Sequence, residues 1–173
     1  IGTDGQGIYS YSNNQYSIRS TLINDFSLKM GHPVRALYID DDRTMWIGSK
    51  GDGILKIHNY DVNKSIFDCK IENITSHNSL LNDNSVYAFA PGTHNILWIG
   101  NEEGLNYYSY SEKRIKKVDL VHNGIALKYI HAIYEQGSYL WLASVGMGAI
   151  KARINWSGDT PVLTVENRFI RSD

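Results

Sequence analysis

A short phrase built around tryptophan recurs along the chain, and this repetition limits the folds open to it. Complete copies, each a Trp-Ile-Gly or close variant followed by a glycine turn, occupy residues 46–54, 98–105 and 141–149, and residues 1–8 match the phrase without its Trp. The aligned residues are Ile1, Ile47, Ile99 and Leu142, so successive copies lie 46, 52 and 43 residues apart. A period of about 40–50 residues indicates a repeat architecture whose units pack against their neighbours.

The residues around these copies are typical of β-structure. A second phrase, Val-x-Ala or Ile-x-Ala followed by an apolar residue, precedes each complete copy at residues 34–37, 86–89 and 130–133. Short apolar runs alternate with polar turn segments; the runs include 34–39, 45–48, 54–57 and 65–67, and the turns include 40–43, 50–53, 91–95 and 146–148. No stretch of helical length has apolar residues at a 3.6-residue period between capping residues. The sequence therefore predicts an all-β fold.

Four short strands in each period of this length are typical of the blades of a β-propeller. We expect about four four-stranded antiparallel blades, the first incomplete, as a fragment of a larger, seven-bladed propeller. Within this one domain the expected boundaries are residues 1–25 for the last strands of a first partial blade, 26–72 for the second blade, 73–121 for the third and 122–173 for the fourth. The last strand of each blade is expected near residues 17–21, 65–71, 115–120 and 162–167. The cut ends of such an array expose apolar surface, for which the remaining blades of a parent chain are the expected partner.

The recurring residues have structural roles in this interpretation. Large aromatic side chains at a fixed place in every repeat favour packing between blades over stacking on a ligand. Small residues on the first strand allow a close approach near the propeller axis, and glycines relieve the turn between the second and third strands. These residues are Trp46, Trp98 and Trp141, then Ala36, Ala88 and Ala132, and finally Gly53, Gly104 and Gly148.

Residues 97–107, Leu-Trp-Ile-Gly-Asn-Glu-Glu-Gly-Leu-Asn-Tyr, closely resemble the two-component regulator propeller repeat, and residues 79–86 resemble the segment that leads into its first strand. The resemblance extends over nearly the whole chain, with Trp-Leu-Ala at residues 141–143 as a departure in the last copy. It implies the periplasmic sensor region of a hybrid two-component histidine kinase of the inner membrane, acting as a homodimer and often responding to oligosaccharides. It also implies that this segment is not an enzyme, since the kinase motifs of such proteins do not occur in it.

The best candidate for a ligand site lies where the repeats differ from one another. Arg35, Tyr87 and His131 share one register of the first strands. Polar residues of the adjoining loops lie on the same face of a propeller; they are His32, Asn84 and Lys128 before the first strands, and Lys50, Asp52, Glu102 and Glu103 in the later turns. Planar polar groups pair with sugar hydroxyls, and aromatic rings cover the C–H surface of a sugar. The sequence therefore predicts an oligosaccharide site at this mouth, although each residue alone is also compatible with an ordinary solvated position.

Two further functions remain open from the sequence. A propeller glycosidase or lyase needs two carboxylates, or a Tyr/His pair, that converge on one pocket, and Asp52, Glu102 and Glu103 are candidates by residue type only. The other function is a scaffold that docks a protein on its rim. We predict no catalytic residue, because the carboxylates occupy turn positions of the repeat.

Charge and residue usage exclude several partners. The chain has 17 Lys+Arg against 18 Asp+Glu, and a net charge of −1 gives no electrostatic footprint for nucleic acid. The basic run at residues 113–117 is interpreted as a solvated strand flank. No metal site or cofactor is predicted, because the histidines are scattered and Cys69 is the sole cysteine.

Overall fold

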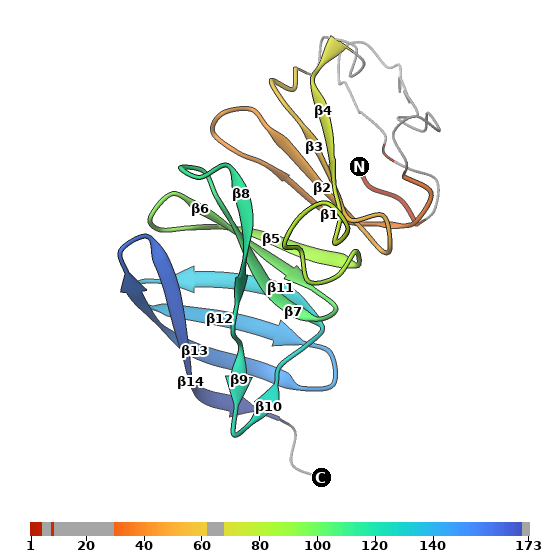
Figure 1. Cartoon of the computed structure of the whole chain (residues 1–173). Helices are drawn as coiled ribbons and strands as arrows, with labels where there is room; N and C mark the ends of the chain where they lie inside the picture. The colour runs from red at the N-terminus through yellow and green to blue at the C-terminus, as the bar shows by residue number, and fades with distance from the viewer. Residues whose placement is uncertain (5–7, 9–29, 62–67, 171–173) are drawn as a thin grey trace, which may run out of the picture.

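The computed structural model describes residues 1–4, 8, 30–61 and 68–170 of the chain (Figure 1). These residues form three four-stranded antiparallel sheets and one two-stranded ribbon, and they contain no α-helix. Accordingly, this part of the chain offers no helix with the length and apolar character needed to span a membrane. The all-β prediction is confirmed.

Each four-stranded sheet is a meander whose strands pair in sequence order. Sheet I consists of β1 (Val34–Ile39), β2 (Met45–Ser49), β3 (Ile54–Ile57) and β4 (Ile71–Ile74). Sheet II consists of β5 (Val86–Gly92), β6 (Ile96–Asn101), β7 (Gly104–Ser109) and β8 (Arg114–Val118). After the ribbon of β9 (Val121–His122) and β10 (Ile125–Ala126), sheet III consists of β11 (Ile130–Gln136), β12 (Tyr139–Ser144), β13 (Gly148–Ser157) and β14 (Thr160–Phe169).

The three sheets follow one another in space as they do in sequence. The first strands adjoin, because β5 contacts both β1 and β11. The other strands spread away from them, so that the sheets fan out one after another in Figure 1. Residues at matching positions of the three first strands are therefore brought to one place.

The last strand of sheet I begins later than the sequence indicates. The expected segment is 65–71, but β4 runs from Ile71 to Ile74, and residues 65–67 lie outside the described residues, as does the segment 17–21 expected for the first blade. Pairing with β3 explains the position of β4, because Ile54 lies opposite Ile74 and Ile57 opposite Ile71. This register packs each isoleucine of β4 against a buried apolar cluster, Ile74 on one side of the sheet and Ile71 on the other. The segments 115–120 and 162–167 overlap β8 and β14.

Two of the repeated tryptophans lie in the seams between sheets. Trp46 is fully buried and contacts the edge of the Tyr108 ring of sheet II, with ring centroids 4.7 Å apart. Trp98 is also fully buried, in a cluster that includes Leu140 and Leu142 of sheet III. Trp141 is only partly buried and stacks on the exposed Phe169 of its own sheet, because no described sheet follows sheet III.

The Gly in the phrase Trp-Ile-Gly marks the closest approach between neighbouring sheets. A Cβ on Gly48 would lie 2.8 Å from Cγ1 of Val86, and a Cβ on Gly100 would lie 2.6 Å from the carbonyl oxygen of Ile130. Each contact is with the first strand of the next sheet, so only glycine fits without movement. Ala143 occupies the matching place in sheet III and is exposed.

The turn glycines have a different role. Gly53 and Gly148 have φ of +78° and +80°, and a Cβ on either would lie within 2.3 Å or 2.1 Å of a carbonyl oxygen of the fourth strand. Gly104, at φ +124°, begins β7. The first-strand alanines differ from one another, since Ala36 and Ala88 are buried and Ala132 is exposed.

Candidate functional site: a hollow at the first strands

Each first strand contains a β-bulge at the same position. The pairing register with the second strand shifts between Val34 and Ala36 in β1, between Val86 and Ala88 in β5, and between Ile130 and Ala132 in β11. The extra residue is Arg35 in the first case, Tyr87 in the second and His131 in the third. A bulge bends its strand and re-aims a side chain. The fold thus gives three different polar side chains the same unusual backbone position.

These three side chains meet at one hollow. Arg35, Tyr87 and His131, together with Lys50, line a space of about 320 Å³. The rings of Tyr87 and His131 stack with centroids 4.0 Å apart and an interplanar angle of 23°. Lys50 reaches the site because its backbone follows β2, donates to the carbonyl of Pro33 at 2.9 Å and bridges to Ser85 just before β5.

Hydrogen bonds fix the aromatic side of the hollow. The Tyr87 hydroxyl donates to Oε2 of Glu102 at 3.1 Å. Burial, and then this bond to a carboxylate, raise the pKa of Tyr87, so the hydroxyl stays protonated at neutral pH. Partial burial and the positive charge of Arg35 lower the pKa of His131, and the negative charge of Glu102 opposes them. The stacked pair is therefore mainly neutral at pH 7 and offers polar edges beside flat rings.

The cationic side of the hollow is accessible to solvent. The Arg35 guanidinium donates to Oδ1 of Asp4 at 3.0 Å, and the two side chains are 39% and 76% exposed. Lys50 is exposed, and within the described ranges no carboxylate forms an ion pair with it. Two cations therefore face a hollow whose lining includes no described carboxylate.

The structure separates the remaining candidates from this hollow. His32 binds Asp52 twice, through its backbone N–H and through Nδ1, each at 2.8 Å. Lys128 pairs with Glu103. Asn84 is a loop-forming residue, because its side chain accepts from the Ser76 N–H and its carbonyl accepts from two turn glycines. Of the ten candidates, Arg35, Lys50, Tyr87 and His131 converge, and Glu102 joins them through Tyr87.

The three carboxylates considered for glycoside cleavage each have a partner of their own. Asp52 is bound to His32, Glu103 to Lys128 and Glu102 to Tyr87. None of them lines the hollow. The described lining therefore holds no facing pair of carboxylates, which the two-carboxylate mechanism needs, but it does bring together one Tyr/His pair, Tyr87 and His131.

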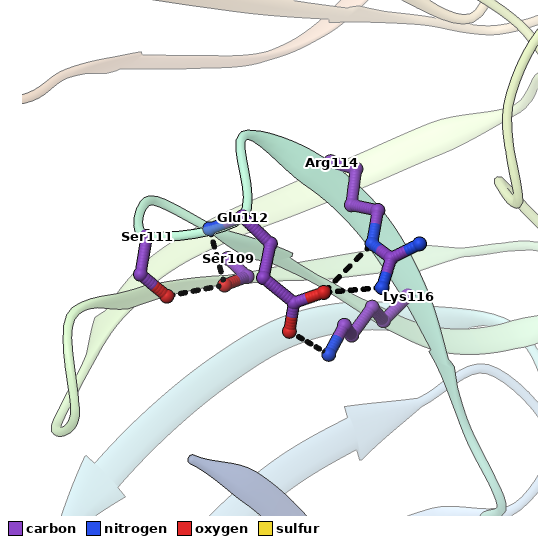
Figure 2. Close-up of polar contacts among 5 residues, drawn as sticks. All are labelled: Ser109, Ser111, Glu112, Arg114 and Lys116. Atoms are coloured by element: carbon purple, nitrogen blue, oxygen red, sulfur yellow. Dashed lines mark hydrogen bonds and ion pairs between the residues drawn. The ribbon is translucent and has the colours of Figure 1, made fainter.

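Two of the four cations in the basic run after β7 pair with one carboxylate. Figure 2 shows Glu112 between Arg114 and Lys116, with one carboxylate oxygen bound to each cation. The turn is closed by Ser109, whose hydroxyl accepts from the Glu112 N–H at 3.2 Å and lies 3.1 Å from the Ser111 hydroxyl. Lys113 and Lys117 of the same run are exposed, as expected of a solvated flank.

Sequence reasoning missed a second hollow and the bulges. A space of about 310 Å³ lies where β7 and β8 adjoin the ribbon, lined by residues that include Asn82, Lys117 and Asp119. The lining combines strand residues of β7, β8 and the ribbon with residues of the connecting segments, and only 103–105 belong to the repeated phrase. The bulges also have no signature in the sequence, because Arg35 and Tyr87 each lie between two buried neighbours, as a residue of a regular strand would. Only the alignment of the repeated Val-x-Ala phrase could single them out.

Comparison with known proteins supports the resemblance to two-component sensors. No protein-family model matches the chain. A histidine kinase of Formosa agariphila, named P4, is 24% identical over 157 residues, which cover 90% of this chain and 10% of that protein. The chain thus spans about a tenth of the curated relative that it matches.

Two solved structures from B. thetaiotaomicron are similar in fold. Both are extracellular domains of hybrid two-component systems. One has a TM-score of 0.63 at 19% identity and covers 93% of this chain and 20% of that one. The other has a TM-score of 0.56 at 24% identity and covers 78% of this chain and 17% of that one. At these identities the likeness concerns the fold.

Proposed function

We propose that this chain is a segment of the extracytoplasmic sensor region of a hybrid two-component receptor, that its sheets are blades of a β-propeller, and that it responds to oligosaccharides. The observation that carries the proposal is the convergence of three bulged residues, Arg35, Tyr87 and His131, on one hollow. The hollow is formed by side chains that vary between repeats, on a scaffold whose packing residues recur. The fold similarity to extracellular sensor domains favours signalling over other uses of such a hollow.

The chemistry of the hollow suits a sugar. The guanidinium and ammonium groups donate hydrogen bonds, and the imidazole can both donate and accept. The stacked rings of Tyr87 and His131 provide a flat, partly apolar wall for C–H groups. The hollow is open, and every residue of its described lining carries a polar group. Such a lining fits a hydrated, polar ligand better than an apolar one.

Calorimetric titration of the purified chain with a panel of oligosaccharides tests this proposal. We expect heat from at least one oligosaccharide, with an affinity that falls about tenfold or more in a Tyr87→Ala variant. Lys113→Gln, on the turn after β7, is the matched control and should bind like the parent chain. The absence of binding heat from every oligosaccharide in the panel, or binding that Tyr87→Ala leaves unchanged, would contradict an oligosaccharide site at this hollow.

Signalling adds a second requirement. A ligand shifts a receptor between two states only by its difference in affinity for them, so binding alone is not sufficient. In a receptor that contains these sheets, the Tyr87→Ala variant should lose its response to the bound oligosaccharide while its unstimulated output persists. A full response from that variant would argue against this site as the sensor.

The outer face of sheet III supports the propeller itself. Trp141 lies opposite Lys151 there, as Trp46 lies opposite Lys56 on the face of sheet I that sheet II covers. Lys151 lies over the Tyr139 ring at 3.9 Å, and Tyr134 is 62% exposed. We propose that a further repeat of the same kind covers this face in the parent receptor.

A further inference from the structure

The hollow at the first strands has an imbalance of charge that a neutral sugar would not use. Arg35 and Lys50 line it, whereas no described carboxylate does. Two carboxylates contact lining residues from outside: Glu102 is held by the Tyr87 hydroxyl, and the exposed Asp4 is bound to Arg35. Arginine offers a planar fork of donors that matches a carboxylate or sulfate, and lysine adds a compact positive charge. Two cations at one small hollow attract anions more strongly than they do hydroxyls.

We infer that this hollow binds the anionic group of an acidic sugar, a carboxylate or a sulfate, between Arg35 and Lys50, with the sugar ring against the stacked pair of Tyr87 and His131. The inference rests on the proposed function, because it takes the hollow as the ligand site of the chain.

Asp4 indicates where the ligand anion would lie. Its Oδ1 accepts from Nη2 of Arg35 at 3.0 Å, but its side chain is 76% exposed. An exposed ion pair is screened by water and salt and contributes little, so Asp4 is readily displaced. A ligand anion that reaches Lys50 as well as Arg35 gains a second cation and would take its place.

His131 makes the binding sensitive to pH. The charged and titratable groups around it are Arg35 of β1, Tyr87 of β5, Glu102 after β6 and Lys50 after β2. In the free protein partial burial and Arg35 lower its pKa below 6.5. A bound anion favours the imidazolium and raises that pKa, so binding is accompanied by proton uptake and tightens as pH falls from about 7.5 to about 5.5.

The test compares probes that differ in charge. The galacturonic acid trimer and its fully methyl-esterified form have the same hydroxyls, and a sulfated chondroitin disaccharide supplies the other anion. Titration calorimetry of the full chain should give at least tenfold tighter binding for the acid trimer or the sulfated disaccharide than for the neutral ester. The difference should shrink at high salt, because the two cations are exposed.

Charge-removing variants assign the effect to residues. Arg35→Gln and Lys50→Gln should each weaken binding of the acidic probe about tenfold and leave the thermal midpoint within about 2 °C of the parent, since both side chains are exposed. Lys113→Gln is the control with the same charge change outside the hollow. His131→Asn should abolish the pH dependence and also weaken binding at pH 7.5, because the imidazole ring is part of the wall against the sugar ring.

The outcomes separate this inference from the proposed function. Equal affinity for acid and ester, or binding unaffected by Arg35→Gln and Lys50→Gln, would overturn the anionic specificity. If neutral oligosaccharides then still bind and Tyr87→Ala still weakens them, the proposed function survives alone. If neither acidic probe binds at millimolar concentration, the inference is overturned. If no oligosaccharide gives any binding heat, the inference and the proposed function are both overturned.

Discussion

Asp40 is a single buried carboxylate that serves three donors. Its Oδ2 accepts from Nε1 of Trp46 and from the hydroxyl of Tyr110, both at 3.0 Å, and its Oδ1 accepts from the Thr44 N–H at 2.8 Å. Tyr110 belongs to the segment after β7, so the bonds join sheets I and II. The proximity of Asp40 adds to burial in raising the pKa of Tyr110, which keeps this donor protonated.

Replacing this carboxylate should therefore be costly. In Asp40→Ala the three donors lose their acceptor in a buried place, and we expect a loss of about 3 kcal/mol in the free energy of unfolding, measured by urea denaturation. Asp42→Ala, at an exposed position of the same turn, should change it by less than about 0.5 kcal/mol. Equal effects from the two variants would show that the seam does not depend on this network.

At the same scale, the sequence indicated which residue types gather at the mouth but not how their charges pair. The alignment of Arg35, Tyr87 and His131 followed from the repeat, which makes matching residues neighbours in space. The binding of Asp52 to His32 and of Glu103 to Lys128 depends on loop conformations that the repeat does not define. Both pairs remove carboxylates that had been candidates for the site.

Between elements, the repeated tryptophans should differ in their contribution to stability. Trp46 and Trp98 are fully buried in the seams, so Trp→Ala at either position should cost about 3–5 kcal/mol. Trp141, partly exposed at the outer face of sheet III, should cost only about 1 kcal/mol. Chemical denaturation followed by circular dichroism measures all three, and a uniform loss would contradict seam packing as the cause.

The seam glycines allow a reciprocal test. In Gly48→Ala the new methyl group meets Val86, and we expect a loss of about 1–3 kcal/mol as sheets I and II are forced apart. Ala143→Gly adds flexibility to an exposed strand position and should cost about 1 kcal/mol or less. Thermal unfolding compares them; a tolerated Gly48→Ala would mean that the sheets separate freely.

The elements themselves were predictable where the repeat was strong. The Trp-Ile-Gly and Val-x-Ala phrases located the first and second strands of each sheet, because apolar and β-branched residues recur there with fixed spacing. The fourth strand of sheet I was expected at 65–71 because of the apolar run at 65–67, whereas β3 pairs with the segment that begins at Ile71 and ends at Ile74. The ribbon β9–β10 has no counterpart among the described residues of the other repeats, so repetition could not reveal it.

Over the whole molecule, one end of the array carries a large apolar surface. Tyr134 is 62% exposed and Phe169 is 52% exposed, next to the partly buried Trp141. Surfaces of this kind on soluble proteins favour association. We expect the isolated chain to self-associate with increasing concentration, as measured by sedimentation velocity, and Tyr134→Ser combined with Phe169→Ser to reduce it.

A surface change elsewhere provides the control for that experiment. Ile125 of the ribbon is 53% exposed, and Ile125→Ser removes a comparable apolar side chain from a different face. The association should persist in this variant. A chain that stays monomeric at every concentration would show that the face of sheet III is compatible with water.

The glycine at each seam also makes the repeats unequal as building blocks. A module whose second strand contains Trp-Ile-Gly accepts a successor at the spacing found here, whereas the module with Ala143 would hold its successor at a wider gap. Shuffling these modules by recombination would therefore yield functional arrays in some orders and not in others. A single methyl group at the seam therefore limits the order in which such modules can be joined.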